Sequence, residues 1–447
     1  MSSTPAVDWS ATSFAGHQLP DWFVNAPLGI FIHWGAYSVP AWAEPTGELG
    51  AVDPQEWFAH NPYAEWYLNT IQIEGSPAWQ HHRDVHGGAP YDDFLDRWRA
   101  EQFDPADWAA LFAHVGADYV VPTTKHHDGI TLWDAPQTGA RNTVHRGPRR
   151  DVVGAIAEAV RAAGLRFGVY YSGGLDWHVR PSASLPSAEG RPFPVPDDDE
   201  YGRYAAAQVQ DLVDRYAPSV LWNDITWPAE SQREGAGGLV ELFEHYYATV
   251  PDGVVNDRWG PTHWDYRTSE YQAFRDLEDD TAWENCRGIG LSFGYNAVES
   301  ESEYLDGPAL ARHLADCVSR GGRFLLNVGP MADGTIPPLQ RTALTQLGDW
   351  MQTAKPHLVG AARIDAPSSD EPFVRWLGHS DRLVGVLDVP GERFARSQPE
   401  AEVTIEVPAA VTGISIVVGG QAELTGRQLT VRLAADRVGP ALVVTEI

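Results

Sequence analysis

The stretch Ser219-Val220-Leu221-Trp222-Asn223-Asp224 is mostly apolar and ends abruptly in a carboxylate. An amphipathic helix pattern precedes it. The apolar positions of that helix are Ala205, Val209, Leu212, Val213 and Tyr216. This order predicts a buried strand that presents an acid at its C-terminal tip. Because (β/α)8 barrel enzymes place their catalytic groups at such tips, the stretch predicts a barrel with Asp224 at its rim.

A unit of helix, glycine and short strand recurs along the chain. Asp104-Pro105 opens one helix, Gly116 closes it, and residues 118–123 form the next strand. Further strands are expected at 166–171, 254–258 and 323–328. Helices that alternate with single short strands imply crossover connections and a parallel sheet. A barrel is favoured over an open doubly wound sheet, because no Gly-x-Gly-x-x-Gly turn follows a strand.

Three segments depart from this unit. Residues 41–93 are rich in Trp, Tyr, His and Pro, and we expect this insertion to form part of a pocket above the barrel. Residues 180–199 are rich in Pro, Ser and Asp, which predicts an irregular loop. Beyond the last helix the apolar period changes to two, as in residues 402–407. The sequence therefore predicts a barrel over residues 1–355 and a small antiparallel β domain over residues 356–447.

Composition restricts the class of protein. The chain has 447 residues and 43% hydrophobic content, which is enough for a large enzyme domain and a smaller one. Its net charge of −29 argues against nucleic acid and anionic membrane partners, and no apolar run reaches the about 18 residues that span a bilayer. Cys286 and Cys317 are interpreted as free thiols in a reducing cytoplasm, because the first residues lack a signal core. We expect a cytoplasmic protein.

Polar and aromatic side chains gather at the expected strand ends. They are His33, His126, His127, Tyr170, Asp224, Arg258 and Asn327, with Trp34, Trp133 and Trp222 close by. Aromatic faces suit the apolar faces of sugar rings, and imidazoles and carboxylates suit hydroxyl groups. A second carboxylate, Glu270, lies beyond another strand-like segment. Two carboxylates in one pocket are the minimum equipment for cleaving a glycosidic bond.

The histidines admit two other interpretations. His33, His126, His127 and Asp128 are candidate metal ligands, but neighbouring residues on a regular strand point to opposite faces. No His-x-x-x-His or His-x-His pair with a suitably spaced carboxylate is present, so we expect no metal site. Alternatively, one of the two adjacent histidines is a hydrogen-bonded core residue, which leaves its neighbour available to a substrate.

Five motifs, in order along the barrel, resemble those of the α-L-fucosidases of glycoside hydrolase family 29. They are LGIFIHWGAYSVP (28–40), KHHDG (125–129), GPRRDVVG (147–154), GIGLSFGYN (288–296) and LLNVGP (325–330). The runs 223–224 and 256–259 look closest to the compact bacterial members. The resemblance implies an α/β fold, namely a (β/α)8-like TIM barrel followed by a C-terminal antiparallel β-sandwich.

The resemblance also implies a role for each matching residue. Asp224 becomes the nucleophile and Glu270 the general acid/base, with Glu284 and Glu65 as competing candidates for the acid/base. The side chains that hold the sugar or the carboxylates are His33, Glu65, Trp66, His126, His127, Tyr170 and Arg258. An apolar niche for the C5 methyl group of fucose is formed by Phe31, Trp222 and Phe293, with Tyr63 nearby.

These roles imply a retaining exo-α-L-fucosidase that needs no metal or organic cofactor. A charged Asp224 attacks the anomeric carbon while Glu270 protonates the leaving oxygen, and Glu270 then activates water. The expected partner is a fucosylated oligosaccharide or glycoconjugate. The alternatives are a glycosidase for an L-galactoside or an L-glucoside, and a sugar-binding protein without catalysis. The linkage stays open, and so does a homo-oligomer, because edge strands alone do not prove association.

Overall fold

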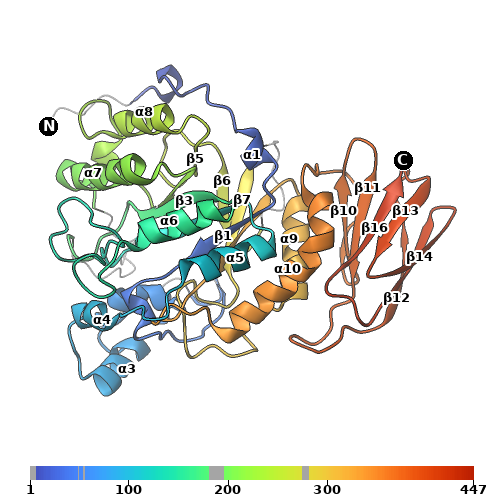
Figure 1. The fold of residues 1–447 in the computed structure, drawn as a ribbon, viewed down its shortest axis with the longest axis horizontal. Helices are drawn as coiled ribbons and strands as arrows, with labels where there is room; N and C mark the ends of the chain where they lie inside the picture. Colours follow the sequence, from blue (N-terminus) through green and yellow to red (C-terminus); the bar gives the residue numbers. More distant parts are fainter. Residues whose placement is uncertain (1–6, 49, 54–55, 181–195, 274–280) are drawn as a thin grey trace.

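The computed structural model describes residues 7–48, 50–53, 56–180, 196–273 and 281–447. Eight parallel strands curl into a barrel in the N-terminal part, and antiparallel sheets form the C-terminal part (Figure 1). The chain therefore has the expected α/β architecture, a (β/α)8-like barrel followed by an antiparallel β-sandwich. Of the irregular loop expected at 180–199, residues 181–195 lie outside the described residues.

Five of the eight barrel strands lie at positions predicted from the sequence. They are β1 (Leu28–Ile32), β2 (Tyr119–Lys125), β3 (Arg166–Ser172), β4 (Val220–Asp224), β5 (Val254–Val255), β6 (Arg267–Glu270), β7 (Trp283–Gly288) and β8 (Arg323–Val328). Their order in the sheet is β5-β4-β3-β2-β1-β8-β7-β6. Sequence neighbours thus pair around the ring from β1 to β5 and from β8 to β6, which leaves β5 and β6 as the two ends of the sheet.

The junction of β5 and β6, here called the β5–β6 seam, closes the ring without a regular ladder. A single parallel bridge joins Asn256 to Tyr266 across it. Side chains add further hydrogen bonds across the seam. Asp257 Oδ1 accepts hydrogen bonds from the backbone N–H and the hydroxyl of Thr268 at 3.0 and 2.7 Å, and Arg258 Nε donates to Thr268 Oγ1 at 3.1 Å.

Strand β5 is shorter than the stretch 254–258 predicted from the sequence. The amide of Asn256 takes the place of backbone pairing to β4, because its Oδ1 accepts from Asn223 N at 3.0 Å and its Nδ2 donates to Asn223 O at 2.9 Å. A side chain that satisfies the neighbouring strand in this way ends the ladder after two residues.

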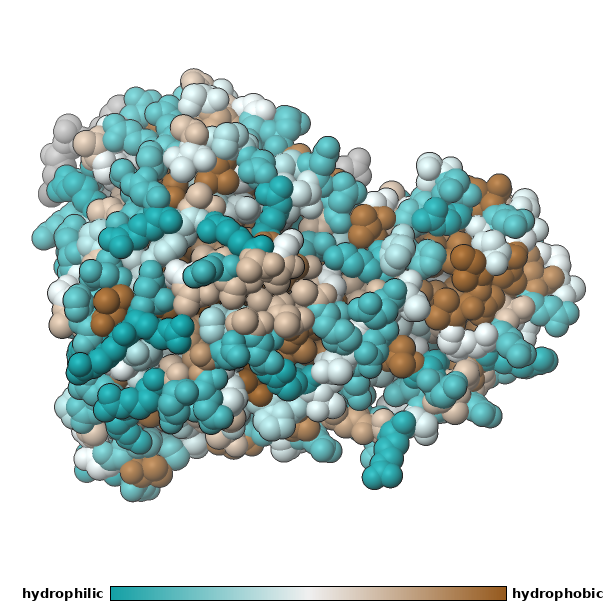
Figure 2. Space-filling view, viewed as in Figure 1, coloured by the Kyte–Doolittle hydropathy of each residue, from teal (hydrophilic) through white to brown (hydrophobic). Residues whose placement is uncertain are grey.

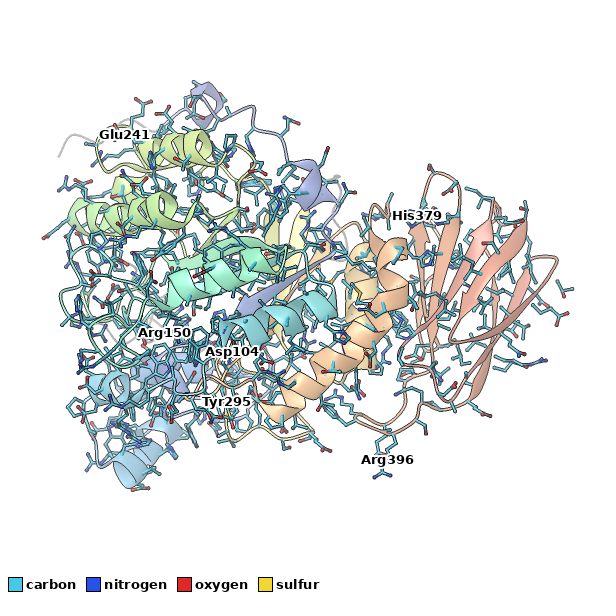
Figure 3. All side chains as sticks on the ribbon, in the orientation of Figure 1. Asp104, Arg150, Glu241, Tyr295, His379 and Arg396 are labelled. Carbon is cyan, nitrogen blue, oxygen red and sulfur yellow. The ribbon has the colours of Figure 1, made fainter. Side chains whose placement is uncertain are left out.

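Helices cover the outside of the barrel. The large ones are α5 (Pro105–Val115), α6 (Val152–Ala162), α7 (Asp199–Tyr216), α8 (Leu239–Thr249), α9 (Gly307–Ser319) and α10 (Pro338–Leu358). Helix α5 begins and ends as predicted. Asp104, labelled at its start in Figure 3, accepts hydrogen bonds from two backbone N–H groups of the first turn, and Gly116 ends the helix with φ of 80°. Within the described residues, no helix connects β5 to β6 or β6 to β7, so the alternation of helix and strand is incomplete.

Several short helices are distributed along the segment before β2. They are η1 (Trp9–Ala11), α1 (Asp21–Val24), η2 (Ala36–Ser38), η3 (Ala64–Trp66), α2 (Tyr67–Thr70), α3 (Pro77–His86) and α4 (Asp92–Arg97), and a further short turn, η4 (Ala229–Ser231), follows β4. The insertion expected at 41–93 thus holds η3, α2 and α3.

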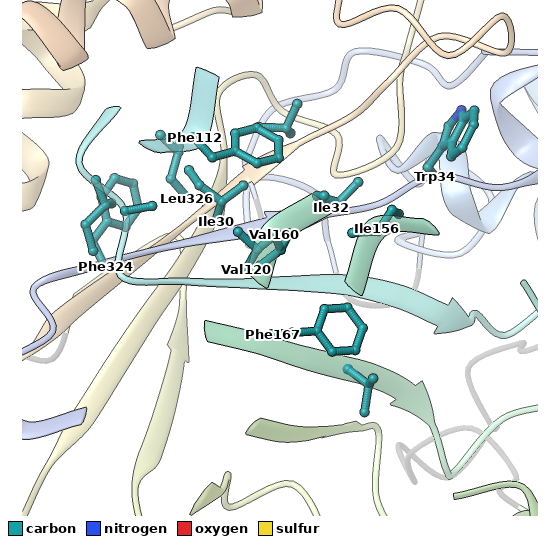
Figure 4. Packing of buried hydrophobic residues seen from close by; sticks show 14 of the residues in the cluster. Ile30, Ile32, Trp34, Phe112, Val120, Ile156, Val160, Phe167, Phe324 and Leu326 are labelled. Carbon is teal, nitrogen blue, oxygen red and sulfur yellow. The ribbon is translucent and has the colours of Figure 1, made fainter. Parts of the chain in front are cut away.

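Strand β1 sends alternate side chains to the two sides of the barrel wall. Ile30 and Ile32 pack outward against apolar residues of α5 and α6, as Figure 4 shows for Phe112, Ile156 and Val160. Phe31 belongs to a separate buried cluster inside the barrel. Because side chains alternate along a strand, His33 follows Phe31 on the inner side.

The C-terminal domain is a sandwich of two antiparallel sheets, β13-β16-β11-β10-β9 and β12-β15-β14. The strands are β9 (Ser369–Asp370), β10 (Phe373–Gly378), β11 (Leu383–Asp388), β12 (Ala401–Glu406), β13 (Gly413–Val418), β14 (Gly420–Thr425), β15 (Gln428–Leu433) and β16 (Ala441–Glu446). Side chains of both sheets, including Trp376, Leu387, Val403 and Val431, form its core. Helices α9 and α10 lie between the barrel and this domain (Figure 1). Helix α10 continues to Leu358, so the division at residue 355 stays a prediction.

The surface in Figure 2 is mostly hydrophilic over the barrel, in keeping with the net charge of −29. Hydrophobic residues on this face gather on the C-terminal domain, and Ile416 on β13 is 49% exposed. None of the described helices combines the length and the apolar character that crossing a bilayer requires.

Candidate active site

A pocket of about 160 Å³ opens among the C-terminal ends of the barrel strands. It is lined by Phe31, His33, Trp57, Tyr63, Glu65, Trp66, His126, His127, Tyr170, Trp222, Asp224, Ile225, Arg258, Glu270, Cys286 and Phe293. Pockets for drug-sized ligands measure about 300–1,000 Å³, so this one suits a single small ring. Apart from the alternative acid Glu284, every residue to which the resemblance gave a role lies in this lining, and these roles stay predictions. Trp34, Trp133 and Asn327, which the sequence also placed at the strand ends, do not line the pocket.

Strand ends and the 41–93 insertion supply the lining. Asp224 is the last residue of β4, as predicted. Glu270 is the last residue of β6, whereas the sequence placed it beyond a strand. The four residues of β6 are partly exposed and lack an apolar pattern, which is why the strand was not recognised. Glu65 and Trp66 come from η3, so the insertion does form part of the pocket.

One guanidinium joins the two carboxylates. Arg258 Nη1 donates to Asp224 Oδ1 at 2.8 Å, and Arg258 Nη2 donates to Glu270 Oε2 at 3.2 Å. Glu270 Oε1 also accepts a hydrogen bond from the hydroxyl of Tyr63 at 2.9 Å. Because a single planar group contacts both acids, the two carboxylates lie close together at the same end of the pocket.

Asp224 is held in its charged form. Burial alone would raise its pKa, but the Arg258 guanidinium and a hydrogen bond from the Tyr170 hydroxyl, 2.8 Å from Oδ2, hold the pKa below its ordinary value. The backbone N–H of Ile225 donates to Oδ1 at 2.8 Å. His127 Nε2 lies 3.7 Å from Oδ2, but burial lowers the pKa of His127 to about 3. This imidazole is therefore neutral at neutral pH, and Arg258 is the cation that stabilises the carboxylate.

The other pocket histidines are neutral as well. Burial lowers the pKa of His33 to about 4 and the pKa of His126 well below its ordinary value. His33 Nδ1 lies 2.7 Å from Asn327 Oδ1, while Asn327 Nδ2 donates to Phe293 O at 2.7 Å. His33 Nδ1 therefore carries the proton, and its Nε2 is an acceptor. Neutral imidazoles can donate and accept, which suits hydroxyl groups.

His126 and His127 both follow the end of β2 at Lys125, and both are buried in the pocket lining. Nδ1 of His126 has no hydrogen-bond partner among the described residues. A buried polar atom of this kind is available to a bound hydroxyl group. In the described part of the chain, no three His, Cys, Asp or Glu side chains are placed to hold a metal ion.

Glu284 lies outside the pocket lining. It is fully buried on β7, where Oε1 accepts a hydrogen bond from Trp222 Nε1 at 2.9 Å and Oε2 accepts one from the hydroxyl of Tyr119. Both carboxylate oxygens are thus engaged behind the Trp222 ring. This position separates Glu284 from a ligand in the pocket. Its side chain supports the Trp222 ring instead.

Glu65 does line the pocket, but its carboxylate is held by neighbouring backbone. Its Oε2 accepts from Gly294 N at 2.7 Å and from the hydroxyl of Ser292 at 3.2 Å. Burial raises the pKa of Glu65 to about 7. Glu270 is instead partly exposed and contacts Arg258, so of these two acids only Glu270 shares a cation with Asp224.

Sequence reasoning missed Trp57, Ile225 and Cys286. Trp57 carried a signal, because it lies in the aromatic-rich insertion. Ile225 carried no sequence signal, because its place in the pocket depends on its backbone conformation. Its φ is 72°, a value that β-branched residues rarely adopt. Cys286 lies beside Glu270 in the register of β6 and β7. Burial raises the pKa of its thiol well above the ordinary value, so it remains protonated.

Tyr170→Phe tests how Asp224 is kept charged. Loss of the hydroxyl removes a donor that favours the carboxylate, so the pKa of Asp224 rises. The acid limb of the pH profile of kcat/KM should move to higher pH, and kcat/KM should fall about 10- to 100-fold, as for a hydrogen bond to a charged group. Tyr171→Phe is the matched control, because the hydroxyl of Tyr171 binds Gln208 instead. Identical profiles for the two variants would contradict the assignment.

Comparisons with known proteins agree with this geometry. The family model described as alpha-L-fucosidase matches residues 2–355. The tissue alpha-L-fucosidase of Macaca fascicularis is 34% identical over 351 residues, which cover 77% of this chain and 69% of that protein. The alpha-L-fucosidase of Dictyostelium discoideum is 34% identical over 356 residues, with 77% and 72% covered. The solved structure of an alpha-L-fucosynthase from Thermotoga maritima is 41% identical, with a TM-score of 0.84 over 98% of this chain and 99% of that one.

Proposed function

The chain belongs to the α-L-fucosidase family of glycoside hydrolases, and from that premise we propose that it is a retaining exo-α-L-fucosidase that acts through a covalent glycosyl-enzyme intermediate. The observation that carries the proposal is the contact of Arg258 with both Asp224 and Glu270 inside a pocket of about 160 Å³. A pocket of that size admits one terminal sugar, which supports exo action.

In the first step the Asp224 carboxylate attacks the anomeric carbon. The bond from that carbon to the leaving oxygen breaks, and Glu270 gives its proton to the oxygen. The depressed pKa of Asp224 supports this role, because a nucleophilic carboxylate has to be ionised. In the second step the Glu270 carboxylate takes a proton from water, the water oxygen attacks the anomeric carbon, and Asp224 is released.

Retention rather than inversion is supported by the shared guanidinium. Retaining enzymes hold their two carboxyl groups about 5–5.5 Å apart, whereas inverting enzymes hold them about 6.5–9.5 Å apart to leave room for a water molecule. Two carboxylates that bind adjacent nitrogens of Arg258 favour the shorter separation.

Recognition of fucose is supported by the apolar niche. The ring centroid of Phe31 lies 4.8 Å from that of Trp222 and 6.5 Å from that of Phe293. These rings suit the C5 methyl group, while the neutral histidines suit the hydroxyl groups. A hydrophobic pocket rejects an added hydroxyl by only about a hundredfold, so an α-L-galactoside should be a slow substrate.

Release of 4-nitrophenol from its α-L-fucoside tests the function. We expect turnover, with kcat/KM about a hundredfold above that for the α-L-galactoside. Comparable rates on the two sugars would show that the niche does not select fucose. Proton NMR of the first product should show α-L-fucose, and β-L-fucose as the first product would establish inversion. No turnover by the folded protein would overturn the proposal.

We also propose a fucosylated oligosaccharide or glycoconjugate as substrate and the cytoplasm as location. Two free, buried thiols, Cys286 and Cys317, support a reducing compartment. The net charge of −29 supports the expectation that neither nucleic acid nor an anionic membrane is a partner.

A further inference from the structure

The mouth of the pocket is formed by the lining residues that are not fully buried. These partly exposed residues are Trp57, Ile225, Arg258 and Glu270, and the other lining residues are buried. Arg258 donates a hydrogen bond to Glu270, and both belong to the reaction centre proposed above. Trp57 and Ile225 are apolar, are partly exposed, and have no part in the two chemical steps.

Trp57 lies on the acid/base side of the mouth. Its ring makes an edge-to-face contact with Tyr63, with centroids 5.4 Å apart and an interplanar angle of 85°. The hydroxyl of Tyr63 donates to Glu270 at 2.9 Å. The leaving group departs on the side of the acid, because its oxygen receives the acid's proton. Trp57 is therefore placed beside the group that leaves.

Ile225 is directed into the mouth by an unusual backbone conformation. It follows the nucleophile directly, and its φ of 72° is one that β-branched residues rarely adopt. Room for this arrangement comes from Gly174, where a Cβ atom would lie 2.9 Å from Ile225 Cβ. The fold thus maintains an unfavourable conformation that puts an apolar side chain at the mouth of the pocket.

We propose that Trp57 and Ile225 form a leaving-group subsite that binds a neutral aglycone with an apolar face, either an aromatic ring or the apolar face of a second sugar. This inference rests on the proposed fucosidase function and specifies its substrate. Tryptophan presents a large flat face of the kind that binds such groups. The charged residues of the mouth favour a neutral aglycone, because Arg258 already pairs with Asp224 and Glu270.

The effect of Trp57→Ala on two substrates distinguishes binding of the leaving group from binding of the sugar. 4-Nitrophenyl α-L-fucoside carries an aryl leaving group, and α-L-fucosyl fluoride carries the same sugar without a ring to bind. We expect kcat/KM for the aryl fucoside to fall about tenfold, the size of one aromatic contact, and that for the fluoride to fall far less. Because kcat/KM covers the steps up to bond cleavage, it reports leaving-group binding.

Two further variants make the outcome decisive. Ile225→Gly suits the positive φ and removes only the side chain, so it should show the same selective loss even if Trp57→Ala does not fold. Trp79→Ala is the matched control, because Trp79 lies in the same insertion, contacts Arg83 and does not line the pocket. Equal losses on both substrates, or no loss on either, would overturn the subsite. A wild-type protein that hydrolyses neither substrate would instead overturn the fucosidase function.

Discussion

Asp224→Ala is expected to lower kcat/KM for 4-nitrophenyl α-L-fucoside at least about a thousandfold, since loss of a nucleophile removes the covalent route altogether. Three donors, from Arg258, Tyr170 and the backbone of Ile225, hold this carboxylate in its charged form at the end of β4. No other described acid of the pocket is held in this way. Steady-state rates beside a thermal unfolding curve would show whether activity is lost while the fold is kept.

Azide gives this variant a signature that a merely damaged enzyme would lack. With Asp224 absent, azide can attack the anomeric carbon of the α-fucoside directly, which yields a β-L-fucosyl azide. A folded variant that keeps more than a few per cent of the wild-type rate would remove Asp224 from the nucleophile role, and formation of the α-azide would point to another residue as the nucleophile.

Glu270→Ala should produce losses that depend on the leaving group. A general acid contributes about 10²–10⁴-fold, so hydrolysis of an unactivated fucosyl disaccharide should fall by that factor. An aryl fucoside with a good leaving group needs little protonation and should lose far less. Azide should restore part of the rate for the aryl substrate and give the α-azide, because it attacks the glycosyl-enzyme in place of activated water.

Glu284→Gln and Glu65→Gln are the comparison variants. Glu284 is hydrogen-bonded to Trp222 and Tyr119 outside the pocket lining. Glu284→Gln should therefore lower the rates on the disaccharide and on the aryl fucoside to a similar degree. The Glu65 carboxylate is held by Gly294 and Ser292, and its variant should weaken sugar binding without selecting a leaving group. If Glu270→Ala slowed both substrates equally, the acid/base role would move to one of these two residues.

Much of the fold was predictable because its signals are local. Asp104 and Gly116 mark the ends of α5 in the sequence, and they act through hydrogen bonds and backbone conformation within one turn. The lack of helices on either side of β6 in the described residues was not predictable, since β5 and β6 meet through one isolated bridge, Asn256 to Tyr266, and through side-chain bonds such as Asp257 to Thr268, which have no periodic signature.

The candidate site was also predictable only in part from the sequence. The residues to which the resemblance gave a role could be named from the sequence, and all of them except the alternative acid Glu284 line one pocket in the structure. The contact of Arg258 with both Asp224 and Glu270 could not be derived, because it depends on how the ends of β4, β5 and β6 converge. Ile225 was missed for a related reason, as only the folded backbone shows that its side chain points into the mouth.

The β5–β6 seam links the integrity of the barrel wall to the occupancy of its pocket. Arg258 reaches across the seam to Thr268 and to Glu270, so local opening of the wall and dismantling of the acid/base pair are one event. A ligand that binds only the closed form lowers the population of the open form in proportion to its concentration. A sugar bound in the pocket would thereby stabilise the irregular junction of the ring that holds it.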